Sequence, residues 1–169
     1  MGRFGLFTFV ALLGSGVVHA SPLKLQDFWG EYTLVQGSEN CPVSLIVRRE
    51  KGQPQNGISF FGYAPHSSGA TSSQYTLAQV SGVEPDGSYF KSEAKLRGHV
   101  LRSQEHRESG CLIHVDLLCD TTEVVEERWR LEFPALSYEG KTSKKSLSDV
   151  SQQSHTTCHF LETLHSPAQ

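Results

Sequence analysis

The chain has 169 residues, of which 37% are hydrophobic, and it carries 15 basic and 18 acidic side chains for a net charge of −3. This length suits one domain with a single core, and the slightly acidic charge excludes a general nucleic-acid-binding role, which needs a basic face to neutralise phosphates. After residue 20 no apolar stretch reaches the roughly 20 residues of a membrane-spanning helix, so we expect no membrane span.

The first 20 residues have the pattern of an export leader. Arg3 precedes an apolar run, Phe4 to Val18, and Val18-His19-Ala20 places small residues at the two positions that a signal peptidase reads. We expect cleavage before Ser21. The mature protein, residues 21–169, is then secreted or periplasmic and forms a single β domain.

Short runs in which apolar and polar residues alternate follow the leader and indicate antiparallel strands. Asn56-Gly57 is a strong hairpin signal, so we expect the runs on either side of it to pair. Gly98 falls within a long run that is either one bent strand or two. The runs expected to form strands are Phe28–Gln36, Cys41–Arg49, Ile58–Tyr63, Gln74–Val80, Ser88–Arg102, Cys111–Cys119 and Glu123–Phe133.

The segments between these runs are expected to be loops. Ala64–Ser73 is rich in Gly and Ser, Arg102–Gly110 is rich in charge, and Thr142–Thr157 is a polar segment expected to form a long surface excursion. Cys158–Leu164 is expected as a short closing segment, either a strand or one or two helical turns. With about seven to nine strands and no crossover helix, the sequence predicts an all-β protein, an antiparallel up-and-down barrel or a sandwich.

Four cysteines, Cys41, Cys111, Cys119 and Cys158, lie in the exported part, where an oxidising compartment favours two disulfides. If Cys111 to Cys119 is one straight strand, its ends lie roughly 26 Å apart at about 3.3 Å per residue, too far for a disulfide. We therefore expect Cys41 to pair with Cys111 or with Cys119, and Cys158 to pair with the other. Either way, Cys158 ties the C-terminal tail to the domain.

Phe28-Trp29-Gly30-Glu31-Tyr32 resembles the first-strand motif of the lipocalin and calycin barrels, with Tyr32 where the family has Trp. The resemblance implies that Phe28, Gly30 and Tyr32 lie at the base of a barrel. It also implies that a basic residue, Arg128 or Arg130, packs over the aromatic ring of residue 32. The interior of such a barrel would hold a small apolar molecule.

No catalytic motif rises above background. His155, Cys158 and His159 have types and spacing that suit Zn²⁺ or Cu²⁺, but a disulfide at Cys158 beside two surface histidines is the preferred interpretation. We therefore expect a binding protein that is not an enzyme and uses no cofactor or metal. The alternative is a secreted interaction or inhibitor domain that contacts a protein partner through its loops, chiefly 64–73 and 102–110.

Overall fold

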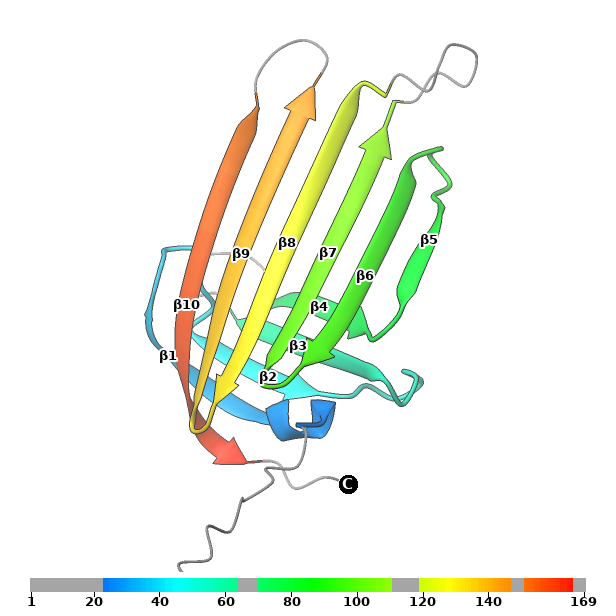
Figure 1. Ribbon diagram of the computed structural model, residues 1–169. Coiled ribbons are helices and arrows are strands. Elements are labelled where there is room, and N and C mark those ends of the chain that lie inside the picture. The colour runs from blue at the N-terminus through cyan, green and yellow to red at the C-terminus, as the bar shows by residue number, and fades with distance from the viewer. Residues whose placement is uncertain (1–22, 64–69, 111–118, 147–150, 166–169) are drawn as a thin grey trace, which may run out of the picture.

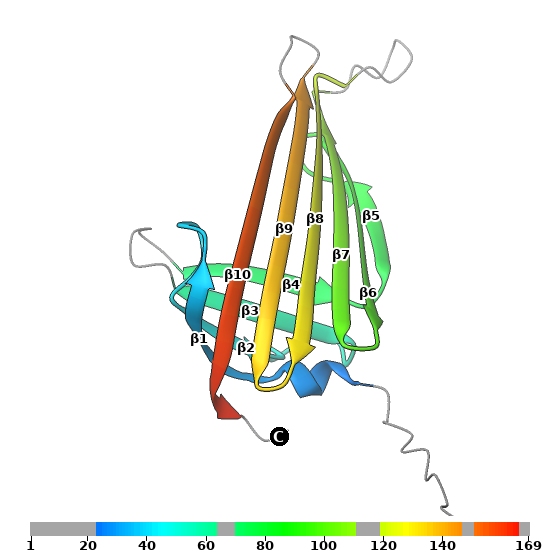
Figure 2. The same ribbon diagram turned by 60° about the vertical axis from the view of Figure 1, so that its left-hand side comes forward.

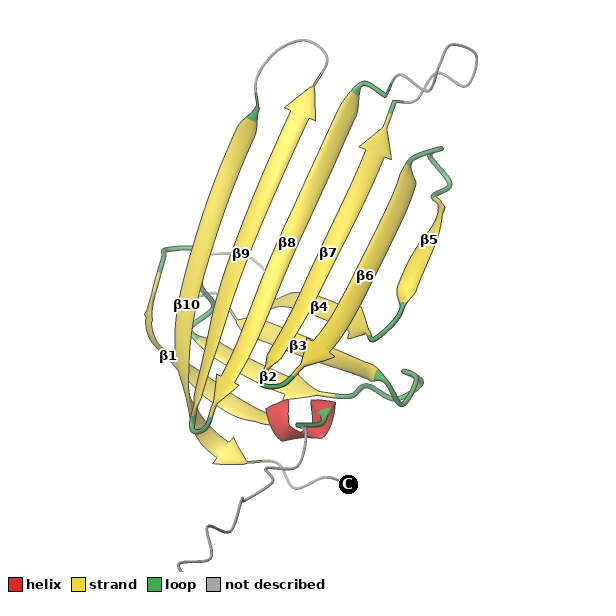
Figure 3. Ribbon diagram, viewed as in Figure 1, coloured by secondary structure: helices red, strands yellow, loops and turns green. Residues whose placement is uncertain are grey.

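The computed structural model describes residues 23–63, 70–110, 119–146 and 151–165. The predicted leader lies outside these ranges, as does the predicted strand Cys111–Cys119 apart from Cys119 itself. Strands make up most of the described chain, and its one helical element is a short 3-10 turn (Figure 3). The all-β prediction is therefore confirmed.

Ten antiparallel strands form one sheet in the order β4-β3-β2-β1-β10-β9-β8-β7-β6-β5. The first and last strands of the chain pair with each other, whereas β4 and β5 are the two edges, so the sheet is not closed into a barrel (Figure 1). The elements are η1 (Leu25–Phe28), β1 (Gly30–Gly37), β2 (Ser44–Arg48), β3 (Gly57–Tyr63), β4 (Ala70–Thr76), β5 (Gln79–Val83), β6 (Tyr89–Arg97), β7 (Val100–Ser109), β8 (Thr121–Glu132), β9 (Ala135–Ser146) and β10 (Gln152–His165).

The sheet folds over on itself, so that a short part, β1–β4, crosses a tall part, β5–β10 (Figure 1). β1 joins the two parts because it pairs with β2 on one side and with β10 on the other. The short part covers the lower half of the tall part, and the upper ends of the long strands extend beyond it (Figure 2). We call the face of the tall part that meets β1–β4 its inner face.

The core fills the space between the two parts. Phe60 of β3 stacks on Trp129 of β8 with ring centroids 4.1 Å apart, and Trp129 lies 4.4 Å from the ring of Tyr138 on β9. Burying each large apolar side chain contributes about 1.5–3 kcal/mol, so these contacts hold the short part against the tall part. The other buried apolar residues of the lower inner face include Leu101, Leu131, Leu136 and Phe160.

Two polar segments that we expected to be loops are largely strand instead. Arg102–Gly110 runs through β7, and Thr142–Thr157 supplies the ends of β9 and β10 on either side of residues 147–150, which lie outside the described ranges. Cys158–Leu164 is not a separate closing segment, because it continues β10, a strand of 14 residues. Among the residues that the structure describes, no layer covers the inner face of the upper half of the sheet (Figure 2), and its strands lack the alternation of apolar and polar residues that marks a half-buried strand.

The described residues alone form ten strands, whereas seven to nine were expected. The predicted run Gln74–Val80 divides between β4 and β5, and Ser88–Arg102 proves to be two strands. Gly98 has a φ of 54° in the tight turn between β6 and β7, a conformation that favours glycine. The pairing of β2 with β3 across Asn56-Gly57 is confirmed.

Candidate functional site

A pocket of about 230 Å³ lies where β2–β4 cross the inner face of β8–β10. Its size is below the 300–1,000 Å³ typical of drug-sized ligands, so it suits a small molecule. Aromatic side chains make up much of its wall. The lining residues are Asn40, Pro42, Leu45, Phe60, Gly62, Thr71, Ser73, Glu127, Trp129, Tyr138, Thr156, Cys158 and Phe160.

Glu127 is the one charged residue among the described residues that line this pocket. Its Oε2 accepts hydrogen bonds from the hydroxyls of Tyr75, at 2.7 Å, and Ser103, at 3.1 Å. Its Oε1 accepts one from the Tyr138 hydroxyl at 2.9 Å. The indole Nε1 of Trp129 donates to the Tyr75 oxygen at 3.1 Å. Strands β4, β7, β8 and β9 therefore all contribute to one hydrogen-bond network around the carboxylate.

The two tyrosines of this network stay protonated well above neutral pH. Burial raises the pKa of Tyr75 and of Tyr138, and the negative charge of Glu127 raises both further. Each phenol therefore remains an O–H donor to the carboxylate. The carboxylate is held in place by neutral groups.

Gly140 explains how Tyr138 reaches Glu127. Gly140 lies opposite Glu127 in the pairing of β8 with β9. A Cβ atom on residue 140 would come within 2.8 Å of Tyr138 Cζ, so the phenol ring lies over the glycine where any side chain would stand. The missing side chain leaves room for the Tyr138 hydroxyl to reach the carboxylate.

A disulfide between Cys41 and Cys158, with Cα atoms 5.8 Å apart, fastens the rim of the pocket. It links the connection between β1 and β2, which carries Asn40 and Pro42, to the middle of β10. The predicted pairing of Cys41 with Cys111 or Cys119 is wrong. Cys158 was expected at the start of a short closing segment, whereas it lies within β10, which pairs with β1 and sets Cys158 opposite Gly37, beside Cys41.

Cys119 is also disulfide-bonded, which agrees with the prediction that the cysteines form disulfides. Cys111 lies outside the described residues. The prediction that Cys158 ties the end of the chain to the domain is confirmed, through a different partner.

The first-strand motif lies at the base of the core. Phe28 and Tyr32 are almost completely buried, Gly30 is buried too, and the Tyr32 hydroxyl donates to the Phe28 carbonyl oxygen at 2.9 Å. Arg128 and Arg130 point away from this base. They lie on the outer face of β8, where their guanidinium groups contact Glu139 at 3.6 Å and Glu132 at 3.4 Å. The structure therefore does not bring either arginine to Tyr32.

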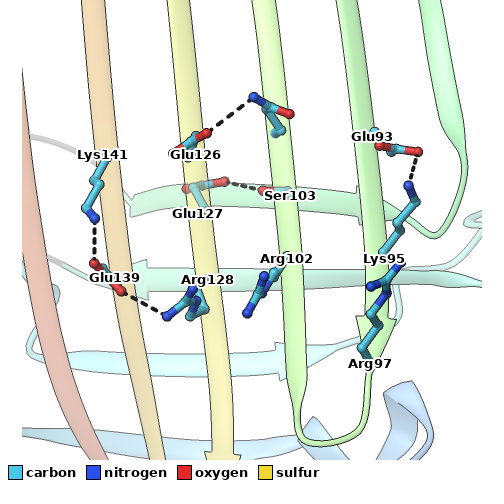
Figure 4. Close-up of a pocket in the computed structure, with 11 residues that line it drawn as sticks. Glu93, Lys95, Arg97, Arg102, Ser103, Glu126, Glu127, Arg128, Glu139 and Lys141 are labelled. Carbon is cyan, nitrogen blue, oxygen red and sulfur yellow. Dashed lines mark hydrogen bonds and ion pairs between the residues drawn. The ribbon is translucent and has the colours of Figure 1, made fainter.

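Arg128 belongs to an open groove of about 330 Å³ on the outer face of β6–β9 (Figure 4). Charges here also pair along single strands: Lys95 with Glu93 at 2.6 Å on β6, and Lys141 with Glu139 at 3.1 Å on β9. Lys141, Arg128 and His155 together lower the pKa of Glu139, with the hydrogen bond from Lys141 as the main cause. Exposed pairs of this kind contribute about 0–1 kcal/mol, which is typical of a solvated strand face.

The two histidines of the candidate metal motif lie exposed on β10, while Cys158 between them is buried and disulfide-bonded. His155 contacts the Glu139 carboxylate at 3.4 Å. Within the described ranges, no three His, Cys, Asp or Glu side chains gather closely enough to hold a metal ion. Within the same ranges, no helix has the length and apolar character needed to cross a membrane.

Comparison with known proteins assigns no family to the chain. A scan against protein-family models finds no match, and a search of curated proteins finds no similar sequence. The resemblance to lipocalins and calycins therefore rests on the first-strand residues and stays a prediction.

Sequence reasoning missed the residues that form the pocket. One signal for Glu127 was present: it stands two positions before Trp129 and four before Leu131, and so shares their buried face. An acidic residue in phase with core residues of a strand points to a buried polar network. Tyr75 and Tyr138 gave no comparable signal, since their meeting depends on how the two parts of the sheet cross.

Proposed function

We propose that the mature protein is an exported binding protein that holds a small ligand in the pocket beside Glu127. The observation that carries this proposal is the pocket itself, where aromatic walls surround one oriented carboxylate. Ligand sites in proteins commonly combine apolar walls with a few polar groups at fixed positions. Phe60, Trp129 and Phe160 supply the apolar contact, and Glu127 supplies the polar anchor.

The leader-like sequence of residues 1–20 supports the export part of this proposal. The Cys41–Cys158 disulfide is consistent with it, because disulfides persist in oxidising compartments and are rare in the cytosol. We propose secretion or a periplasmic location on these two grounds.

The alternative, a protein-interaction domain that acts through its loops, has less to support it. Residues 102–109 belong to β7, and residues 70–73 belong to β4. Two of the surfaces on which that alternative depended are therefore wholly or partly strand.

A pocket-filling variant tests the proposal. Thr156 lines the pocket, so Thr156→Phe places a ring inside it, while Thr157→Phe adds the same ring on the exposed face of the same strand. Two measurements search for the ligand of the wild-type chain: a thermal-shift screen of small molecules, and native mass spectrometry of protein purified from its own source. We expect them to find a ligand. A ligand at 100 times its Kd stabilises the folded state by about 2.7 kcal/mol.

Binding should be lost in Thr156→Phe and kept in Thr157→Phe. Failure of every compound to bind the wild-type protein, or equal binding to both variants, would overturn the proposal. Retained affinity for a protein partner in Thr156→Phe would instead support the interaction alternative.

A further inference from the structure

We infer that the ligand of this pocket is a small organic cation, a protonated amine on an apolar body. This inference rests on the proposed function, because it names the class of ligand for the same site. It is drawn from the charge, the hydrogen bonding and the walls of the pocket.

The charge of Glu127 has no basic partner at the site. Of the described residues that line the pocket, none is Lys, Arg or His. The three groups that donate to the carboxylate are the hydroxyls of Tyr75, Ser103 and Tyr138, which are neutral. Glu127 is half-buried, and a cationic ligand would place an opposite charge beside its carboxylate.

The carboxylate also keeps a free acceptor position. A carboxylate offers about four lone-pair positions, and Glu127 uses two on Oε2 and one on Oε1. Oε1 can therefore accept one further hydrogen bond. An N–H group of the ligand could donate this fourth hydrogen bond. A donor that carries positive charge forms a stronger hydrogen bond to a carboxylate than a neutral donor does.

Aromatic walls favour the same class of ligand. Phe60, Trp129, Tyr138 and Phe160 line the pocket and provide apolar contact for the body of such a ligand. A neutral apolar ligand would displace water from Glu127 without replacing its hydrogen bond, which costs affinity. An anion would meet the carboxylate's repulsion.

Three ligands with one ring and different charge test the inference: benzylammonium, benzyl alcohol and benzoate. We expect isothermal titration calorimetry on the mature protein to give benzylammonium at least about tenfold higher affinity than benzyl alcohol, the scale of a hydrogen bond to a charged group. Benzoate should not bind measurably. Glu127→Gln should remove the preference for the amine, while Glu126→Gln, on the opposite face of β8, should keep it.

The comparison of the three ligands needs only the wild-type chain, so it holds even if Glu127→Gln fails to fold. Equal affinity for benzylammonium and benzyl alcohol would overturn the inference and leave the proposed function standing. If none of the three ligands binds, the inference is wrong, and the proposed function is decided by the screen with Thr156→Phe and Thr157→Phe alone.

Discussion

At the scale of single residues, Gly140 and Tyr138 decide where the Glu127 carboxylate lies. The Tyr138 ring lies over the glycine, contacts Trp129 and donates from its hydroxyl to the carboxylate. These contacts limit the positions open to both side chains. A change at the glycine therefore acts on the pocket without touching a lining residue.

Gly140→Ala should displace the Tyr138 ring, because the new Cβ meets ring atoms that pack against Trp129 and hold the hydroxyl on Glu127. Overpacking of this kind costs about 1–3 kcal/mol, and we expect the urea midpoint to fall accordingly. Ser143→Ala, at an exposed position of the same strand, is the control and should change stability little. Equal midpoints for Gly140→Ala and wild type would show that the ring is free to move.

Three tyrosines with raised pKa values make the stability of the folded protein depend on pH in the alkaline range. Burial is the main cause that raises the pKa of Tyr32, Tyr75 and Tyr138 above the usual value of about 10. When a group has a higher pKa in the folded state than in the unfolded state, it contributes its full stabilisation at pH values below the unfolded pKa. That contribution is lost as the pH rises through the pKa of the folded state. We expect the urea midpoint to fall steadily above about pH 10, and to fall less steeply in Tyr138→Phe. A flat midpoint up to pH values where free tyrosine is fully ionised would contradict this.

At the scale of elements, the disulfide ties the β1–β2 connection to β10 across a sequence separation of 117 residues. Closing so long a loop restricts the unfolded chain, which is the main source of stabilisation in the chain-entropy account. The same bond holds Pro42 and Cys158 on the wall of the pocket. It therefore serves both the fold and the proposed binding site.

Replacing both cysteines, Cys41→Ala with Cys158→Ala, should lower the free energy of unfolding by about 2–5 kcal/mol. Denaturant unfolding measures the loss, and non-reducing peptide mapping of the wild-type chain should recover the peptides of Cys41 and Cys158 joined together. A map that joins Cys41 to Cys119 would contradict the structure.

The elements also show where strand prediction from sequence works. β2 and β3 were predicted with their pairing, because apolar residues alternate there and Asn56-Gly57 marks the turn. Most of β7, residues 102–109, was predicted as a loop. Its residues Glu105 and Arg107 lie on the inner face above the layer formed by β1–β4, so polar side chains occupy both faces of the strand.

At the scale of the whole molecule, the crossing of the two parts divides the tall sheet into a packed lower half and an upper half with polar faces. Leu131 and Trp129 of β8 are buried, whereas Val125 and Glu123, on the same face nearer its start, lie in the upper half and are only partly buried. Local opening of a sheet is easiest where few apolar contacts oppose it. The upper half should therefore be the less stable part.

Hydrogen exchange should show this division. We expect the amides of residues 122–126 to exchange faster than those of residues 129–131 on the same strand, although both sets lie within β8, which is paired on both sides. Exchange measured by mass spectrometry of overlapping peptides provides the test. Uniform protection along β8 would show that the sheet opens as one unit.

The sequence by itself determined the all-β class, the β2–β3 hairpin and the presence of disulfides. These features depend on local alternation, turn residues and composition, which are readable within a few neighbouring residues. Only the tertiary structure decided the Cys41–Cys158 pairing, the strand character of the polar segments and the network around Glu127. Each of these depends on which strands cross and how far one part of the sheet covers the other, and contacts between distant strands leave no local pattern in the chain.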